Sequence, residues 1–165
     1  MQAARTARAF WRFSLRHYRR PGMAARLIDL QDSHGLDVNL LLFCLFAATR
    51  GRVLERTEIA LARAAVRPLV ASLLGPLRAA RRGLGSELAG LPVAARRRLK
   101  ARLTRLELEL ERHCQAAICG AVPLPSRGRL EAASTRAAAS LRRYAGARIG
   151  PGLIGALTEG LGARP

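Results

Sequence analysis

The sequence predicts an all-α protein, a single helical bundle of five or six helices with a flexible C-terminal tail. Apolar residues recur at the three- and four-residue steps of an α-helix over most of the chain, and no stretch keeps the two-residue alternation of a β-strand. Half of the 165 residues are hydrophobic. This is enough apolar material for one domain of that length to bury a core.

The first predicted helix carries its arginines on one side. They recur at three- and four-residue steps and therefore share one stripe, beside a face that includes Trp11 and Leu15. The stripe consists of Arg5, Arg8, Arg12, Arg16 and Arg19. Pro21 and Gly22 end this helix, because the residue before a proline is pushed out of the α conformation. A short second helix is expected over 23–32.

A third helix is predicted to begin at Asp37 and to lie in the core. Gly35 breaks the chain, and Asp37 is well placed as the helix cap, with its carboxylate accepting the free backbone N–H groups of the first turn. The segment that follows is apolar nearly all round, which indicates burial on several sides. Arg50 and Gly51 end the helix, a cation in the last turn followed by the residue best suited to a left-handed cap.

Two longer helical regions follow. The region 54–84 keeps helical spacing although Pro68 and Pro76 lie inside it, which predicts two helices or one kinked helix. After a glycine-rich turn over 83–91, the longest helix is expected from Pro92 to about Ile118. Its leucines are spaced close to a heptad, so this face forms either a coiled-coil seam or a packing face within the bundle.

These patterns divide the chain into four parts. They are a helical bundle domain over 5–119, a proline-containing linker over 120–126, an alanine-rich helix over 127–145 and a glycine-rich tail over 146–165. The tail is expected to be flexible, because it combines many glycines with a terminal position.

The chain is strongly basic. Its 29 lysines and arginines face 11 acidic residues, which gives a net charge of +18, and all the basic residues except Lys100 are arginines. Coding bias in a GC-rich genome accounts for arginine over lysine, but it does not account for the surplus of charge. Such a surplus favours contact with a polyanion (nucleic acid or the ribosome) or with an acidic protein. A merely basic soluble surface and contact with a membrane surface are the alternatives.

The cysteines and the longest apolar run predict a compartment. Cys44, Cys114 and Cys119 are odd in number and form no C-x-x-C motif, which favours free thiols in the cytoplasm and no metal site. The longest apolar run, 38–48, would span about 16 Å as a helix, against about 30 Å for a bilayer core. The sequence therefore predicts no transmembrane segment.

The predicted polyanion-binding site lies around the glycine-rich turn. Between Glu58 and Glu107 the only acidic residue is Glu87. If the flanking helices fold back antiparallel, the cations of one helix lie beside those of the other. The proposed set is Arg78, Arg81, Arg82, Arg96, Arg97, Arg98 and Lys100. Guanidinium groups bind phosphate oxygens in bidentate fashion. Cations at the start of a helix are also unfavourable beside the positive end of the helix dipole, so a bound anion would stabilise them. The structural alternative is a well-solvated basic face.

The aspartates offer a rival site. Asp29, Asp32 and Asn39 form a candidate polar site, and with Asp37 they lie within a short segment. Carboxylates this close can hold Mg²⁺ or act as acid and base, so a metal-dependent hydrolase is an alternative function. The structural alternative is that Asp37 caps a helix and that Asp29 or Asp32 pairs with an arginine.

No cofactor-binding loop or catalytic constellation stands out. We therefore expect a non-enzymatic binding protein without a cofactor, and the sequence leaves its oligomeric state open. A third alternative is an adaptor that acts through the helix seam over 99–110.

One stretch resembles a small proteobacterial family known only as a domain of unknown function. The pattern is FWxFSLxxY over 10–18, then Pro21-Gly22, then LQDxxGLDVNLLLFC over 30–44, and it continues to about residue 114. The resemblance implies a helical bacterial protein and carries over no active site. The family pattern often has an aromatic residue before its Pro-Leu-Arg element and a lysine where this chain has Gly83. If either belonged to a site, this chain has lost it.

Overall fold

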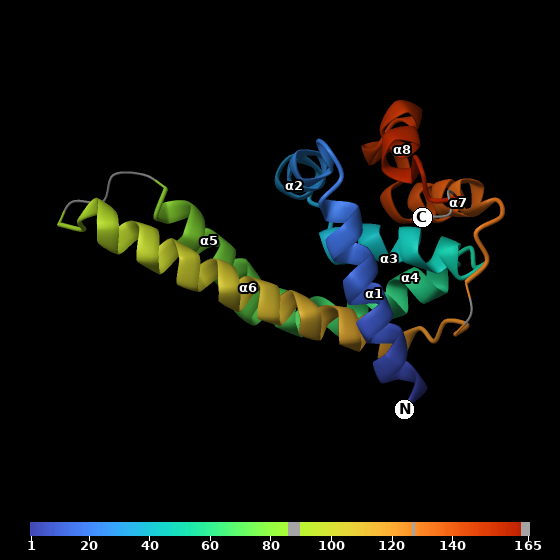
Figure 1. Ribbon diagram of the computed structural model, residues 1–165, viewed down its shortest axis with the longest axis horizontal. Coiled ribbons are helices and arrows are strands. Elements are labelled where there is room, and N and C mark those ends of the chain that lie inside the picture. Colours follow the sequence, from blue (N-terminus) through green and yellow to red (C-terminus); the bar gives the residue numbers. More distant parts are fainter. Residues whose placement is uncertain (86–89, 127, 163–165) are drawn as a thin grey trace.

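The computed structural model describes residues 1–85, 90–126 and 128–162, and within those ranges it is built from helices without a strand (Figure 1). The predicted all-α class is confirmed. The helices are α1 (Gln2–Tyr18), α2 (Met23–His34), α3 (Val38–Thr49), α4 (Arg56–Leu69), α5 (Gly75–Gly83), α6 (Val93–Ala121), α7 (Ala133–Ala145) and α8 (Pro151–Thr158). Because α4 and α5 join through a π-helical turn, the described chain has seven helical runs, close to the five or six predicted.

The core surrounds α3. Eleven of its twelve residues are buried, and α7 packs along it more extensively than any other helix does. From α1, Phe10 is fully buried and stacks on Phe46 with ring centroids 5.1 Å apart, while its edge meets Phe43 at 5.5 Å. A helix covered on all sides needs apolar residues around its whole circumference, which is the pattern that this segment carries.

Two polar contacts attach α7 to the start of α3 and to the α3–α4 loop. The Asp37 carboxylate accepts hydrogen bonds from the backbone N–H groups of Asn39 (2.8 Å) and Leu40 (3.3 Å), so Asp37 caps α3. The backbone N–H of Asp37 donates to the Tyr144 hydroxyl at 2.8 Å, and that of Leu54 donates to the buried Ser140 hydroxyl at 2.9 Å. Buried backbone N–H groups need such partners.

The two prolines do not end the helical run, because a π-helical turn between them joins α4 to α5. Pro68 lies inside α4 and Pro76 lies in the first turn of α5, with the π-helical turn Val70–Leu74 between them. Pro76 has no N–H to donate, and a π-helical turn accommodates the resulting gap in the hydrogen-bond ladder. Among the described residues, the joined run Arg56–Gly83 is the one helix whose length and composition would let it cross a membrane.

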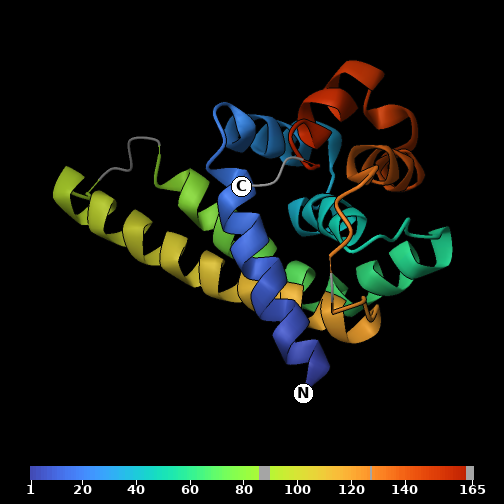
Figure 2. The same ribbon diagram turned by 45° about the vertical axis from the view of Figure 1, so that its right-hand side comes forward.

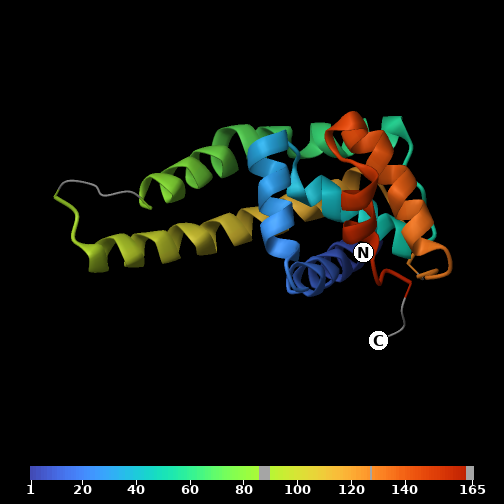
Figure 3. The ribbon, with the colours of Figure 1, turned by 90° about the horizontal axis from the view of Figure 1, so that it is seen from above.

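α5 and the first half of α6 form an arm that projects from the other helices (Figures 1 and 3). α6 has 29 residues, and its buried residues all lie from Glu107 onward. α1 crosses the second half of α6 and connects the arm to the rest of the fold (Figure 2). The first half of α6 therefore has solvent on most of its circumference.

The flexible tail expected over 146–165 is not confirmed. Pro151 opens α8, and Ile154, Leu157 and Leu161 are buried against the core. The Ser134 hydroxyl donates to the backbone carbonyl of Thr158 at 3.0 Å and holds α8 against α7. The prediction weighted the glycine content and overlooked the three- and four-residue spacing of these apolar side chains, which makes one apolar face.

Candidate functional site

The arm neutralises two of the predicted polyanion-binding cations. The Arg78 Nη2 atom lies 2.9 Å from Glu111 Oε1, and the Arg81 Nε atom lies 2.7 Å from Glu107 Oε1. Both ion pairs join α5 to the middle of α6. The expectation that 78–82 lies beside 96–98 is therefore wrong. Attraction between opposite charges sets a different register, and the first turns of α6 extend beyond the end of α5 (Figure 1).

The other predicted cations lie in two places: Arg82 is in the last turn of α5, and the rest lie in the first turns of α6, which form the arm tip. Arg82, Arg97, Arg98 and Lys100 are exposed and form no ion pair within the described ranges, whereas Arg96 is half-buried and has an interaction partner. Glu87 and the rest of 86–89 lie outside those ranges. The arm tip thus keeps three of the predicted cations exposed, Arg97, Arg98 and Lys100, and its role as a binding site stays a prediction.

A denser basic surface lies on α1. All five stripe arginines, Arg5, Arg8, Arg12, Arg16 and Arg19, are exposed, and none forms an ion pair among the residues that the structure covers. At about 1.5 Å per residue, the stripe is about 21 Å long. We call these five side chains the α1 basic stripe. The amphipathic pattern predicted it only as the polar side of a helix, although a further signal was visible, because no acidic residue precedes Asp29.

A basic cleft runs beside this stripe. It has a volume of about 800 Å³. Its lining includes Arg12, Arg16, Arg20, Arg50 and His17, and none of the described residues that line it is acidic. Arg50 lies over the Phe46 ring at 4.8 Å, and Arg20 forms an ion pair with Glu159 at 3.8 Å. The cleft therefore extends the positive surface of α1 toward the C-terminal helices.

His17 is the buried member of this cleft. It is 4% exposed, its ring stacks on Phe13 with centroids 5.5 Å apart, and its Nε2 atom has no hydrogen-bond partner within the described ranges. Burial lowers the pKa of His17 to about 4, the positive charge of Arg20 contributes to the lowering, and a hydrogen bond with the Leu157 backbone opposes the shift. The imidazole is therefore neutral at pH 7.

This burial predicts acid sensitivity. The unfolded chain takes up the His17 proton below about pH 6.5, whereas the folded chain resists it until about pH 4, so the free energy of unfolding falls as pH decreases across that interval. The loss attributable to His17 is about 3 kcal/mol. Urea unfolding at neutral and acidic pH measures it. His17→Gln should lose less stability on acidification than the wild type, and equal losses would contradict the assignment.

The aspartates do not form a shared site. Asp29 accepts a hydrogen bond from the Ser33 hydroxyl at 2.8 Å, Asp32 accepts one from the Gln31 amide at 3.3 Å, and Asp37 caps α3. Over the part of the chain that the structure describes, no three histidine, cysteine, aspartate or glutamate side chains gather where a metal could bind. Nothing in this geometry supports the hydrolase alternative.

The cysteines are buried thiols. Cys44, Cys114 and Cys119 are all free, and burial raises their pKa values to about 12, 11 and 12. The thiolate is the reactive form, so these side chains are poor nucleophiles at neutral pH.

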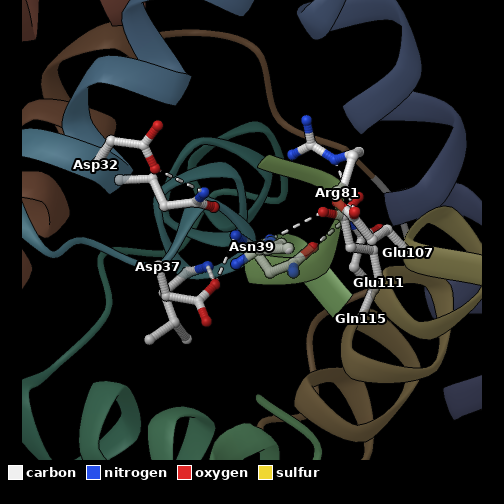
Figure 4. Close-up of polar contacts among 10 residues, drawn as sticks. Asp32, Asp37, Asn39, Arg81, Glu107, Glu111 and Gln115 are labelled. Carbon is white, nitrogen blue, oxygen red and sulfur yellow. Dashed lines mark hydrogen bonds and ion pairs between the residues drawn. The ribbon is translucent and has the colours of Figure 1, made fainter. Parts of the chain in front are cut away.

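A pocket lies where the arm meets the other helices. Its volume is about 390 Å³, and five helices line it: α1, α2, α3, α5 and α6. The two Arg–Glu pairs of the arm form one wall, and Asn39 and Gln115 also line the pocket. Figure 4 shows Arg81, Glu107 and Glu111 near these two amides. Of the predicted polar site, only Asn39 lines this pocket, and Gln115 was not among the predicted site residues.

The two amides of the pocket are only partly hydrogen-bonded. The Gln115 Nε2 atom donates to the Ser14 hydroxyl at 3.1 Å and to Asn39 Oδ1 at 3.0 Å. Asn39 Nδ2 and Gln115 Oε1 are buried and lack a hydrogen-bond partner among the described residues. No local sequence pattern could have predicted that these two side chains meet, because the two residues are 76 positions apart.

The leucine seam of α6 has two environments. Leu99 is 39% and Leu106 is 48% exposed, whereas Leu110 packs against the core. Its outer half is open to solvent, and nothing in the fold identifies a helix that would pair with it.

The comparisons with known proteins identify a family and no activity. No curated protein and no solved structure matched the chain. The family model described as "Protein of unknown function (DUF2390)" matches residues 9–118, which is more than half of the chain and includes every residue that lines the pocket at the base of the arm. The chain therefore belongs to the DUF2390 family of proteins of unknown function.

Proposed function

We propose that this protein is a non-enzymatic, cytoplasmic binding protein that holds the phosphate backbone of a nucleic acid against the α1 basic stripe. The observation that carries the proposal is the set of five exposed arginines on one face of one helix, none of which forms an ion pair within the described ranges. The basic cleft beside the stripe adds Arg50 to the same surface, together with Arg20, which is paired with Glu159.

The stripe costs the free protein stability. Arg8 with Arg12, and Arg12 with Arg16, are like-charged pairs four residues apart, and each costs about 0.2–0.5 kcal/mol in a helix. A row of phosphates converts this repulsion into attraction and releases counterions, which favours binding at low salt. Guanidinium groups also suit phosphate oxygens geometrically.

The surface offers backbone contacts rather than sequence recognition. The aromatic side chains of α1 are buried or half-buried, with Phe10 in the core and Trp11 in the wall of the pocket. Unpaired bases therefore have no exposed aromatic platform on this helix on which to stack. We expect similar affinity for duplexes of different sequence.

Two triple variants with equal charge loss test the location. Arg5→Gln/Arg12→Gln/Arg16→Gln removes part of the stripe, and Arg97→Gln/Arg98→Gln/Lys100→Gln removes part of the arm tip. Binding of a fluorescent RNA or DNA duplex is measured by anisotropy against salt concentration. The α1 variant should reduce the slope of log K against log salt by about 0.9 for each phosphate that the protein no longer neutralises, and the tip variant should change it less.

Three outcomes would contradict the proposal. Equal losses in the two variants would show that only net charge matters, and a larger loss in the tip variant would place the site on the arm. If polyglutamate displaced the fluorescent duplex as effectively as unlabelled duplex does, at equal charge concentration, the partner would be an acidic protein instead. Thermal unfolding of both variants checks that each one folds.

A further inference from the structure

The pocket at the base of the arm is not used by the proposed function. With a volume of about 390 Å³ it falls in the size range of small-molecule sites, which are mostly apolar with a few convergent polar groups. Its apolar walls include Trp11, Leu15, Leu42 and Leu108. An aromatic or aliphatic body of a small molecule therefore finds both a matching surface and sufficient space.

The polar groups of the pocket define what the ligand must carry. Asn39 and Gln115 are each 2% exposed, and one donor (Asn39 Nδ2) and one acceptor (Gln115 Oε1) remain unpaired among the described residues. Turning both amides over exchanges their nitrogen and oxygen atoms but again leaves one donor and one acceptor unpaired. Native folds rarely leave such groups unpaired, because the desolvation cost is not recovered.

The two amides, rather than the surrounding charge, exclude ions, because the exposed Arg19 also lines the pocket and forms no ion pair within the described ranges. Arg78 and Arg81 are already paired with Glu111 and Glu107, so this wall of the pocket is neutral. A carboxylate would offer only acceptors and would leave the Gln115 oxygen facing another oxygen, and an ammonium group would offer only donors. An uncharged carboxamide or lactam edge carries one donor and one acceptor together.

We infer that this pocket binds an uncharged, planar small molecule whose carboxamide or lactam edge pairs with Asn39 and Gln115 while its apolar body packs beside Trp11. Ser14 positions the Gln115 amide, and the two Arg–Glu pairs fix one wall of the pocket. The proposed role is binding alone, without a chemical reaction. This inference does not depend on nucleic-acid binding, because Asn39 and Gln115 are not part of the α1 basic stripe.

Three probes of similar size test the inference on the full chain. Benzamide carries both a donor and an acceptor, benzoate carries acceptors only, and toluene carries neither. With ¹⁵N-labelled protein, benzamide should shift the side-chain amide signals of Asn39 and Gln115 and the indole signal of Trp11. It should bind about tenfold more tightly than toluene or benzoate, as expected for two hydrogen bonds with buried groups.

A double variant supplies the matched control. Asn39→Leu/Gln115→Met preserves side-chain size and removes both amides, so benzamide affinity should fall to that of toluene while toluene binding persists. Equal binding of benzamide and toluene by the wild type, or no shift of the Asn39 and Gln115 signals, would overturn the inference. The wild-type comparison decides the matter even if the variant does not fold.

Discussion

A chain ending at Ser126 should fail to fold cooperatively. That truncation removes α7 and α8, and α7 is the helix that covers α3 most extensively. Each leucine or phenylalanine of α3 that becomes exposed loses about 1.5–3 kcal/mol. The backbone N–H groups of Asp37 and Leu54 also lose their partners on α7. Two or three exposed side chains plus these bonds approach the total stability of about 5–15 kcal/mol for a typical domain.

Urea unfolding followed by circular dichroism measures this effect. The control is a chain ending at Gly162, which keeps both helices and should unfold like the full chain. If the chain ending at Ser126 unfolded at the urea midpoint of the full chain, 127–162 would add nothing to the stability of the bundle domain predicted over 5–119. A single substitution, Tyr144→Phe, separates the hydrogen bond to Asp37 from the packing of the ring and should cost about 1 kcal/mol.

The helical class was predictable because its signals are local. The spacing of apolar side chains depends only on near neighbours, and the apolar circumference of 38–48 already indicated a helix covered on all sides. The last helix was missed because its glycines lower helix propensity, while its burial against the core supplies the stability. Packing against distant residues leaves no trace in a short window of sequence.

The candidate sites also differ in whether they depend on local sequence or on tertiary contacts. The α1 basic stripe is a local pattern and could be read directly, although the predicted binding site lay elsewhere, around the glycine-rich turn. The ion pairs of Arg78 and Arg81 depend on how far α5 slides along α6, with partners 33 and 26 positions away. The pairing of Asn39 with Gln115 likewise depends on tertiary geometry. Charge counting along the sequence therefore overestimated the free charge of the arm.

Phe10→Ala should destabilise the protein by about 3–5 kcal/mol, the range for removing a buried aromatic side chain. Phe10 is fully buried, and it contacts both Phe43 and Phe46 of the central helix. Its removal leaves a cavity between α1 and α3 that rigid neighbours fill only in part. A loss of this size shifts the urea midpoint strongly without changing the slope of the transition.

Phe13→Ala is the matched control, with the same chemical change three residues along the same helix. Phe13 is half-buried and contacts Phe46 and His17 at ring distances of 5.5 Å, so its loss should cost about 1–2 kcal/mol. Equal costs for the two substitutions would mean that α1 does not insert into the core at Phe10. The basic stripe would then lie on a helix attached only loosely to the fold. A large difference between the two costs instead indicates that the α1 arginines project from a rigid support, which is the arrangement that several simultaneous phosphate contacts require.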